Sequence, residues 1–448
     1  MSQLARKLGV IDYFSLGWGT MVGVGWLVVM DDWLSRGGPV GAMLGFAIGG
    51  ALLLPIGYVY GQLVAAMPDA AGEIAYTARV FPQYVSYATG WMMLLAYFIV
   101  CPWEAVALGR IAGYIFPSLN SIALYSIGGK PVYLPHLLIG LGLTAILTIL
   151  NYRGIRLSAT FQNWTAFGTI ALFVVFVSFG AAHGSAQNIA PAFGDKGVLV
   201  SIFLVMQIVP YFMTGFESVG KAAEEAAPEF RAGGYFKAIV AAIVVGFVFY
   251  VIVIGAVAYA APWKSLLDRP FMTAIAFEQA VGSRWIVNAI LAAALLSLFK
   301  VFNGNFVASS RMLFALGRRG LIDERFATVH FTNRTPSTAV VWTGIVTAAC
   351  MFLGQAILVP ISEVGSVASA IGWTAACASY YLMRPTPIKK TIAAVGVLLG
   401  TGMIAMKVVP ALPGHFTGWE WLALILWICA GIALRTSSRL AKPANTAG

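Results

Sequence analysis

The chain has 448 residues, of which 60% are hydrophobic and only 10% are charged, and its mean hydropathy is +0.84. A soluble domain carries about 25% charged residues, so this composition excludes a soluble protein and indicates an integral membrane protein. The net charge of +11 does not indicate a nucleic-acid partner, because most basic residues fall on one side of the predicted membrane spans, as the positive-inside rule describes.

Apolar runs near the ~20 residues that cross a bilayer recur along the chain and predict an all-α fold with about twelve membrane spans. The basic loops place both termini in the cytoplasm of a protein inserted in the cell membrane. Residues 1–11 form a polar N-terminal segment without a signal-peptide cleavage site, and residues 436–448 form a polar tail. The predicted spans are residues 12–34, 40–67, 83–117, 135–151, 158–182, 198–222, 235–261, 284–316, 338–358, 361–383, 389–408 and 417–435.

Glycines interrupt the first span at Gly19, Gly23 and Gly25. Glycine lets a membrane helix unwind, and the exposed backbone groups must then line a cavity or bind a ligand rather than face lipid. The alternative is a notch for close helix packing. Asp31 and Asp32 follow at the end of this span, as a solvated helix end near the outer interface or as an acidic funnel that concentrates cations.

Glu104 lies inside the third span, in the run Cys101–Arg110. A carboxylate within a membrane is costly and usually marks a substrate, ion or proton pathway. Arg110 is six residues away, a spacing that does not share a helix face as spacings of three or four do. Three interpretations stay open: an ion pair with Arg110, a contact with a substrate amine, and a proton carrier.

The sixth span repeats the pattern of the first in its run Tyr211–Glu217, where Gly215 precedes Glu217 within an apolar segment. A matched pair of interrupted spans, one in each half of the chain, is the best sequence indication of a transporter binding site. Freed amides suit a carboxylate and freed carbonyls suit an ammonium group. Glu217 is a candidate for gating or for proton coupling.

Five segments together resemble the amino acid–polyamine–organocation (APC) transporters over nearly the whole chain. Any one of them is weak, whereas five in the right order are strong. They are Gly23-Val24-Gly25, where Val24 replaces a serine of the family's turn; Tyr60–Met67 followed by Pro68, Ala71, Gly72 and Tyr76; Gly215-Phe216-Glu217; the acidic loop Ala223–Pro228; and Ser310–Gly320 followed by Phe326, Ala327 and His330.

The resemblance implies the leucine-transporter fold, in which two five-span repeats have opposite topology. The repeats would cover residues 12–182 and 198–383 of a core over 12–383, and residues 389–435 would add two helices. The implied substrate site takes a carboxylate at Gly23, Val24 and Gly25, and an ammonium at carbonyls around Tyr211, Phe212 and Thr214, beside Gly215. Trp26 is a candidate wall of this site, and Asn305 occupies the approximate place of a gating aromatic.

The resemblance also bears on the coupling ion. Some proton-coupled relatives carry a lysine in the fifth span in place of a sodium ion, and counting along the chain places Thr169 at that position. Coupling through such a lysine is therefore not expected. A sodium site would use Thr169, the hydroxyls of Ser309 and Ser310, and the carbonyl of Val22, although a serine in a membrane helix more often bonds its own backbone.

The predicted function is secondary transport of an amino acid or an organic amine by alternating access, without a cofactor or metal and with H⁺ or Na⁺ as possible coupling ions. The acidic residues favour a cationic substrate, and a neutral amino acid is the alternative. A membrane enzyme would need a polar cluster within the spans, but His136, His183, His330 and His415 lie at span ends or in loops, and the four cysteines lack metal-ligand spacing. A sensor that binds without transporting is a further alternative.

Overall fold

The computed structural model describes residues 7–154, 159–267, 269 and 271–440. Within these ranges, nine helices are long and apolar enough to cross a membrane, and a bent pair of helices would make a tenth. The fold is therefore an all-α membrane protein, as predicted. The count of twelve spans stays a prediction, because the broken first helix and the 15-residue Ser337–Met351 helix are each shorter than a full span.

Helices run along the whole chain. In order, they are α1 (Val10–Met21), α2 (Gly25–Val28), α3 (Met30–Leu52), α4 (Leu54–Ala66), α5 (Glu73–Ala78), α6 (Gln83–Phe98), α7 (Val100–Ile115), α8 (Leu134–Tyr152), α9 (Ala159–His183), α10 (Val198–Met206), α11 (Val209–Met213), α12 (Ser218–Lys221), α13 (Gly233–Ala260), α14 (Met272–Val281), α15 (Arg284–Arg318), α16 (Ser337–Met351), α17 (Leu358–Leu382), α18 (Pro387–Val408) and α19 (Gly418–Leu440). Short 3-10 turns lie in the connections: η1 (Pro117–Leu119), η2 (Ala186–Ile189), η3 (Ala223–Glu225), η4 (Trp263–Leu266), η5 (Glu324–Ala327) and η6 (Gly354–Ile357).

A β-hairpin that was not predicted from the sequence connects α7 to α8. Its antiparallel strands are β1 (Ala123–Ile127) and β2 (Lys130–Tyr133), with Ile127 opposite Lys130. Gly128 and Gly129 form the turn with φ of 56° and 76°. Two-residue hairpin turns of type I′ need positive φ at both positions, which glycine adopts without strain.

The first predicted span is broken as its glycines indicate. Helix α1 ends at Met21, Val22 is extended with φ −96° and ψ 101°, and α2 begins at Gly25. The chain then passes into α3, which turns at Gly38 (φ 63°, ψ 174°) just before Pro39. The predicted spans 12–34 and 40–67 thus correspond to α1–α4, with the second break at Gly38.

The sixth predicted span is also broken. It consists of α10, α11 and α12. The segment Val209–Lys221, which contains α11 and α12, is bent by 44° relative to α10. Pro210 lies in the first turn of α11, and Gly215, with φ of 137°, lies in the unwound stretch between α11 and α12. Since a φ of 137° is accessible almost only to glycine, the sequence dictates where this helix opens.

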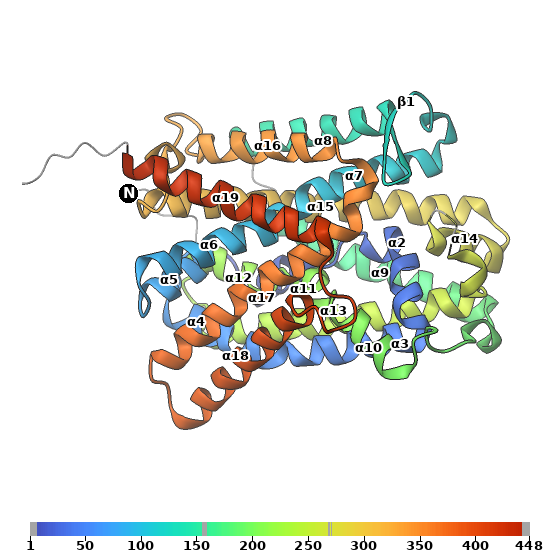
Figure 1. The fold of residues 1–448 in the computed structure, drawn as a ribbon, viewed down its shortest axis with the longest axis horizontal. Coiled ribbons are helices and arrows are strands. Elements are labelled where there is room, and N and C mark those ends of the chain that lie inside the picture. The colour runs from blue at the N-terminus through green and yellow to red at the C-terminus, as the bar shows by residue number, and fades with distance from the viewer. Residues whose placement is uncertain (1–6, 155–158, 268, 270, 441–448) are drawn as a thin grey trace, which may run out of the picture.

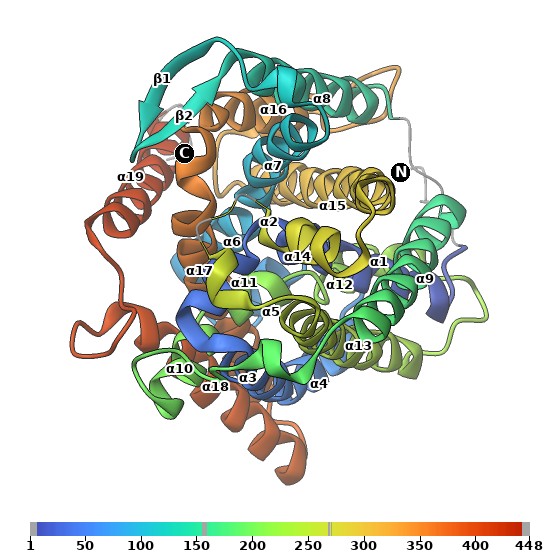
Figure 2. The same ribbon diagram turned by 90° about the vertical axis from the view of Figure 1, so that its right-hand side faces the viewer.

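The long helices run roughly along one axis of the bundle (Figure 1). Viewed along that axis, α1, α2, α11 and α12 lie in the middle, with α8, α9, α18 and α19 toward the outside (Figure 2). We call the end that carries β1, β2 and α14 the hairpin end, and the opposite end the α5 end. Helix α1 begins at the α5 end, where Leu8 pairs with Ala226.

Candidate functional site

The two breaks meet at the centre of the bundle. A Cβ atom added to Gly215 would lie 2.8 Å from the backbone nitrogen of Met21, so the unwound backbones are in direct contact. The hydroxyl of Tyr250, on α13, lies within donating distance of Met21 O (3.4 Å) in the first break and of Phe212 O (3.3 Å) in the second. The broken helices therefore form one site although they are nearly 200 residues apart in the sequence.

A small cavity lies between the breaks, with about 20 Å³ of free volume. That volume suffices for about one water molecule and not for an amino acid. Six of the predicted substrate-site residues line the cavity: Gly23, Gly25, Glu104, Tyr211, Phe212 and Thr214. Sequence reasoning missed six more lining residues: Thr20, Met21, Val100, Trp103, Tyr250 and Val301.

Both predicted glycines of the first break allow close approach of another side chain. A Cβ on Gly23 would lie 2.6 Å from Glu104 Oε1, and a Cβ on Gly25 would lie 2.6 Å from the ring of Phe212. No hydrogen bond of the described chain uses the backbone N–H groups of Gly23, Val24 or Gly25. Buried N–H groups are almost always paired, so these amides are ready to bind an acceptor.

Glu104 is 3% exposed, and its Oε2 has no hydrogen-bond partner among the described residues. Arg110, the partner considered from the sequence, instead donates to Val28 O at 3.5 Å and lies over the ring of Phe271 at 5.0 Å. The charged neighbour of Glu104 is Lys300 on α15. Lys300 was not predicted as a site residue. The sequence could have indicated it, because it is a charged residue inside an apolar run, a feature that marks functional positions in membrane helices.

The other predicted residues of the second break are held by hydrogen bonds to α17. Thr214 donates to Pro210 O at 2.7 Å and lies in hydrogen-bonding distance of Ser369, and Tyr211 N donates to the hydroxyl of Ser366 at 3.2 Å. The hydroxyl of Tyr211 has no partner in the described part of the chain. These contacts fix the unwound backbone while leaving the Tyr211 hydroxyl available at the cavity.

Glu217 and Asn305 flank the meeting point. Glu217 Oε2 accepts a hydrogen bond from Gly215 N at 3.1 Å, so this carboxylate holds the unwound turn, while its Oε1 is unpartnered among the described residues. Asn305 Nδ2 lies 3.4 Å from Thr20 O and donates to Val301 O at 2.9 Å. Asn305 thus contacts the end of α1 and does not line the central cavity.

Trp26 and Val24 face away from the central cavity. They line a second small cavity together with Thr169 and Ser297, where Trp26 packs edge-on against Phe176 at 5.1 Å. Residues of the predicted cation site are dispersed: Val22 O accepts from Ser297 at 3.5 Å, Thr169 donates to Thr165 O in its own helix, and Ser310 donates to Val307 O. The hydroxyl of Ser309 is buried without a partner in the described structure.

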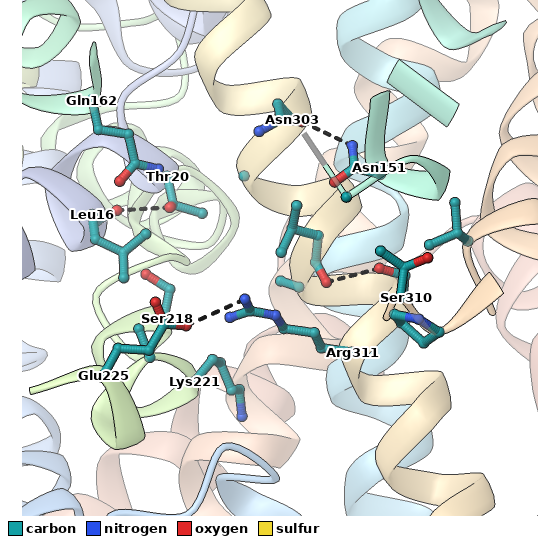
Figure 3. Close-up of a pocket in the computed structure, with 18 of the residues that line it drawn as sticks. Leu16, Thr20, Asn151, Gln162, Ser218, Lys221, Glu225, Asn303, Ser310 and Arg311 are labelled. Atoms are coloured by element: carbon teal, nitrogen blue, oxygen red, sulfur yellow. Dashed lines mark hydrogen bonds and ion pairs between the residues drawn. The ribbon is translucent and has the colours of Figure 1, made fainter. Parts of the chain in front are cut away.

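A wider vestibule opens toward the α5 end, with a free volume of about 240 Å³ (Figure 3). Polar side chains form part of its lining: Arg311 reaches Glu225 at 3.4 Å, and Asn151 donates to Asn303 at 2.9 Å. Thr20 lines both the vestibule and the central cavity. The vestibule therefore leads to the side chain that borders the central site.

The hairpin end is closed by a buried ionic network. Arg36 on α3 contacts Asp32 at 2.8 Å and Glu363 on α17 at 2.7 Å. Glu363 also pairs with Lys407 on α18, which bonds Gln207 on α10 at 2.9 Å. Asp32 contacts Arg36 within α3, and Arg36 joins this helix to a network that spans four helices.

An apolar helical bundle in which two broken helices meet at a buried cavity, with a wider vestibule on one side, defines a multi-pass membrane transporter. The chain belongs to the amino acid permease family, whose model matches residues 8–434. This confirms the resemblance to APC transporters.

Three relatives show how widely the family's named substrates vary. The chain is 25% identical to the methylthioribose transporter of Bacillus subtilis, over 96% of this chain and 92% of the relative. It is 25% identical to the branched-chain amino acid permease BcaP of the same organism (81% and 77% covered). It is also 25% identical to the vacuolar cationic amino acid transporter 4 of Arabidopsis thaliana (86% and 64% covered). All three names describe transporters.

Proposed function

We propose that this permease moves an amino acid or organic amine across the cell membrane by alternating access, with both termini in the cytoplasm and with the halves 12–182 and 198–383 as an inverted repeat. The observation that carries the proposal is the contact of Gly215 with the backbone of Met21 beside a small cavity. Such a meeting of unwound backbones within a membrane is tolerated only where it lines a protein cavity, and it supplies both halves of a zwitterion site.

The free amides of Gly23, Val24 and Gly25 are the proposed seat of a substrate carboxylate. The carbonyl of Phe212 and the hydroxyl of Tyr211 are proposed to receive the ammonium group, because they border the same cavity. Since the cavity holds about one water molecule, the ring of Phe212 over Gly25 must move for a substrate to enter. The vestibule that reaches Thr20 is the proposed release path to the cytoplasm.

Glu104 supports a cationic substrate or an amine, because its carboxylate lies beside Gly23 at the cavity. A second candidate is a neutral amino acid, and one observation favours it: Lys300 is a positively charged neighbour that offsets the charge of Glu104. The names of the relatives include both substrate classes. Glu104 is therefore the side chain at which the two candidates make different predictions.

The test is counterflow exchange in proteoliposomes with a panel of labelled cationic amino acids, polyamines, neutral amino acids and methylthioribose. We expect saturable exchange of at least one amino acid or amine. For a cationic substrate, Glu104→Gln should raise the substrate concentration at half-saturation by about tenfold or more, which corresponds to about 1.4 kcal/mol of binding free energy. An equal rise in this concentration for neutral substrates would assign Glu104 a structural role.

The matched control is Glu229→Gln, which removes an exposed carboxylate outside the vestibule and should not change exchange. If compounds of the panel stabilise the purified protein against heat but none of them is exchanged, the result would contradict transport and support a sensor. Ligand binding raises the unfolding temperature whether or not flux occurs, so the two measurements separate these outcomes.

A further inference from the structure

The vestibule is large enough to hold a small molecule of its own. Its free volume is about 240 Å³, against about 20 Å³ for the central cavity. Pockets for drug-sized ligands begin near ~300 Å³, so the volume of the vestibule suits a smaller ligand such as an amino acid. Because Thr20 lines both spaces, a ligand held in the vestibule lies between the central cavity and the α5 end.

Two groups of helices form opposite walls of the vestibule (Figure 3). One wall comes from α1 and from the stretch α12 to η3, and it carries Ser218 and Glu225. The other wall comes from α8 and α15, and it carries Asn151, Asn303 and Arg311. The first wall belongs to the two broken helices. A ligand that contacts both walls therefore fixes the distance between the broken helices and the rest of the bundle.

Ser218 presents a hydroxyl that the described chain does not satisfy. The residue is 5% exposed and lines the vestibule, and its Oγ has no hydrogen-bond partner among the described residues. A buried hydroxyl without a partner is destabilising, and alanine would fill nearly the same space without this cost. A hydrogen bond to a ligand in the vestibule would remove the cost, so the serine is better explained by binding than by packing.

The two asparagines of the opposite wall use only part of their hydrogen-bonding capacity. Asn151 Nδ2 donates to Leu147 O and to Asn303 Oδ1, both at 2.9 Å. The described chain gives these two side chains no other hydrogen bond. An amide has two donor hydrogens and an acceptor oxygen. The Asn303 amide hydrogens and the Asn151 oxygen are therefore available to a ligand.

Charged side chains make the vestibule suitable for a zwitterion. Arg311 contacts Glu225 at 3.4 Å, so opposite charges of the two walls lie side by side. Arg334 also lines the vestibule, is exposed, and forms no ion pair in the described chain. The charge of Lys221, a further lining residue, is balanced by Glu73. The lining thus offers two guanidinium groups to a carboxylate and the Glu225 carboxylate to an ammonium group.

We propose that the vestibule is a second binding site, which takes a free α-amino acid from the α5 end and slows transport when it is filled. This inference rests on the proposed transport function and adds its regulation. The ligand carboxylate binds Arg311 and Arg334, its ammonium group binds Glu225, and Ser218 and Asn303 make the remaining polar contacts. A ligand in this position blocks the path from the central cavity. It also favours the state open at the α5 end, because closure of that end removes the space that it fills.

The chemistry of the lining determines which compounds inhibit. The proposed contacts go to the α-carboxylate and the α-ammonium group, which all amino acids share. Inhibition should therefore depend weakly on the side chain of the ligand and strongly on its carboxylate. L-Valine and L-arginine should both inhibit, whereas isobutylamine and agmatine, which are the same molecules without the carboxylate, should not.

The experiment uses right-side-out membrane vesicles, loaded with increasing concentrations of one of these four compounds. It measures the initial uptake of the labelled substrate that the exchange panel identifies, and vesicles from cells without the protein give the background. For the wild type we expect uptake to fall by about tenfold at high internal L-valine or L-arginine. The same loading with isobutylamine or agmatine should not produce this fall.

Two variants test the site itself. Arg334→Gln removes the unpaired charge and should raise the internal amino-acid concentration that halves uptake by about tenfold. Its matched control is Arg79→Gln, which removes an exposed arginine at the α5 end outside the vestibule lining and should leave this concentration unchanged. Ser218→Ala should raise the concentration without lowering the thermal unfolding temperature, since the lost hydroxyl has no partner in the described chain. A purely structural serine would give the opposite result, with lower stability and unchanged inhibition.

The possible failures are distinguishable. If uptake rises with internal amino acid and then stays level, the ligand acts through the central site alone, and the inference is overturned while transport stays intact. Equal inhibition of the wild type, Arg334→Gln and Ser218→Ala would have the same meaning. Equal inhibition by the amines would show that no carboxylate is recognised and would also overturn the inference. Absence of any exchange would instead contradict the proposed function.

Discussion

Single glycines at the central cavity act through the space that they leave for a neighbour. The Phe212 ring over Gly25 is held by Trp33 at 4.8 Å and by Tyr211 at 5.0 Å, so it has little freedom to yield to a methyl group. Gly25→Ala should therefore displace the ring into the cavity and lower uptake by about tenfold or more. Tightly packed interiors tolerate added volume poorly.

Gly168→Ala is the control for this prediction, because a Cβ there meets nothing within 4 Å on α9. It should keep uptake, and both variants should reach the membrane in equal amounts. If Gly25→Ala takes up substrate at the wild-type rate, the substrate does not use the space beside Phe212.

At the α5 end, Glu73 and Lys221 form a buried ion pair in which Glu73 also accepts from the hydroxyl of Tyr60 at 3.0 Å. Removal of one partner of a buried pair leaves the other charge uncompensated, at a cost of about 3–5 kcal/mol. Glu73→Gln should thus lower the thermal unfolding temperature in detergent by a large amount. Asp323→Asn breaks an exposed pair with Arg325 and should change it little, because exposed pairs contribute little to stability. Equal effects would mean that Glu73 is not stabilised by its partner.

The candidate site shows what a sequence can indicate at this scale. Gly23 and Gly25 were identifiable because a second interrupted span occurs in the other half of the chain. Glu104 was identifiable because a carboxylate is rare in an apolar run. Gly23, Gly25 and Glu104 all line the cavity. Trp103 and Tyr250 were not, because an aromatic in a membrane helix is more often a packing or interface residue. The direction in which Trp26 points depends on the rotation of α2 about its own axis. Because the segment between α1 and α2 is unwound, the rotation of α2 does not follow from that of α1, so the sequence did not predict it.

The two broken helices contact each other at the points where they are interrupted. Gly215 combines a φ of 137° with direct contact to α1, whereas Gly282, which ends α14, has a φ of 71° and open space around it. Alanine costs about 1–2 kcal/mol of backbone strain at Gly282, which is left-handed, and about 1–3 kcal/mol at Gly215, whose φ is accessible almost only to glycine. At Gly215 it also separates the two breaks, so Gly215→Ala should abolish uptake while Gly282→Ala should retain it. Loss of uptake in both variants would attribute the effect to strain alone.

Long helices were predictable because their length and apolarity are set by the bilayer: the predicted 135–151 and 389–408 agree with α8 and α18 to within two residues. Boundaries failed where tertiary packing decided them. The predicted 338–358 becomes the shorter α16 followed by η6, since Gly354, with a φ of 58°, turns the chain against Val132 of the hairpin. That hairpin was itself missed, although its Gly128-Gly129 turn is a recognisable signal.

For the whole molecule, the two ends of the bundle differ. The α5 end is open through the vestibule, and the hairpin end is tied by Arg36, Glu363 and Lys407 across three helices. In alternating access, opening of one end and closure of the other belong to a single equilibrium, and a perturbation shifts it only by acting differently on the two states. The ionic network exists when the hairpin end is closed, so its loss should favour the state that is open at that end.

Glu363→Gln tests this coupling, because it weakens the contacts to Arg36 and Lys407 without changing side-chain size. We expect faster amide hydrogen exchange at the start of α3 and of α17, and slower exchange around the vestibule in α12 and η3, since the variant populates the opposite state. Asp195→Asn breaks an exposed pair with Lys264 at the same end and should leave both regions unchanged. Faster exchange at the hairpin end with no change at the vestibule would show local loosening rather than a shift between two states, and would contradict a single rocking equilibrium.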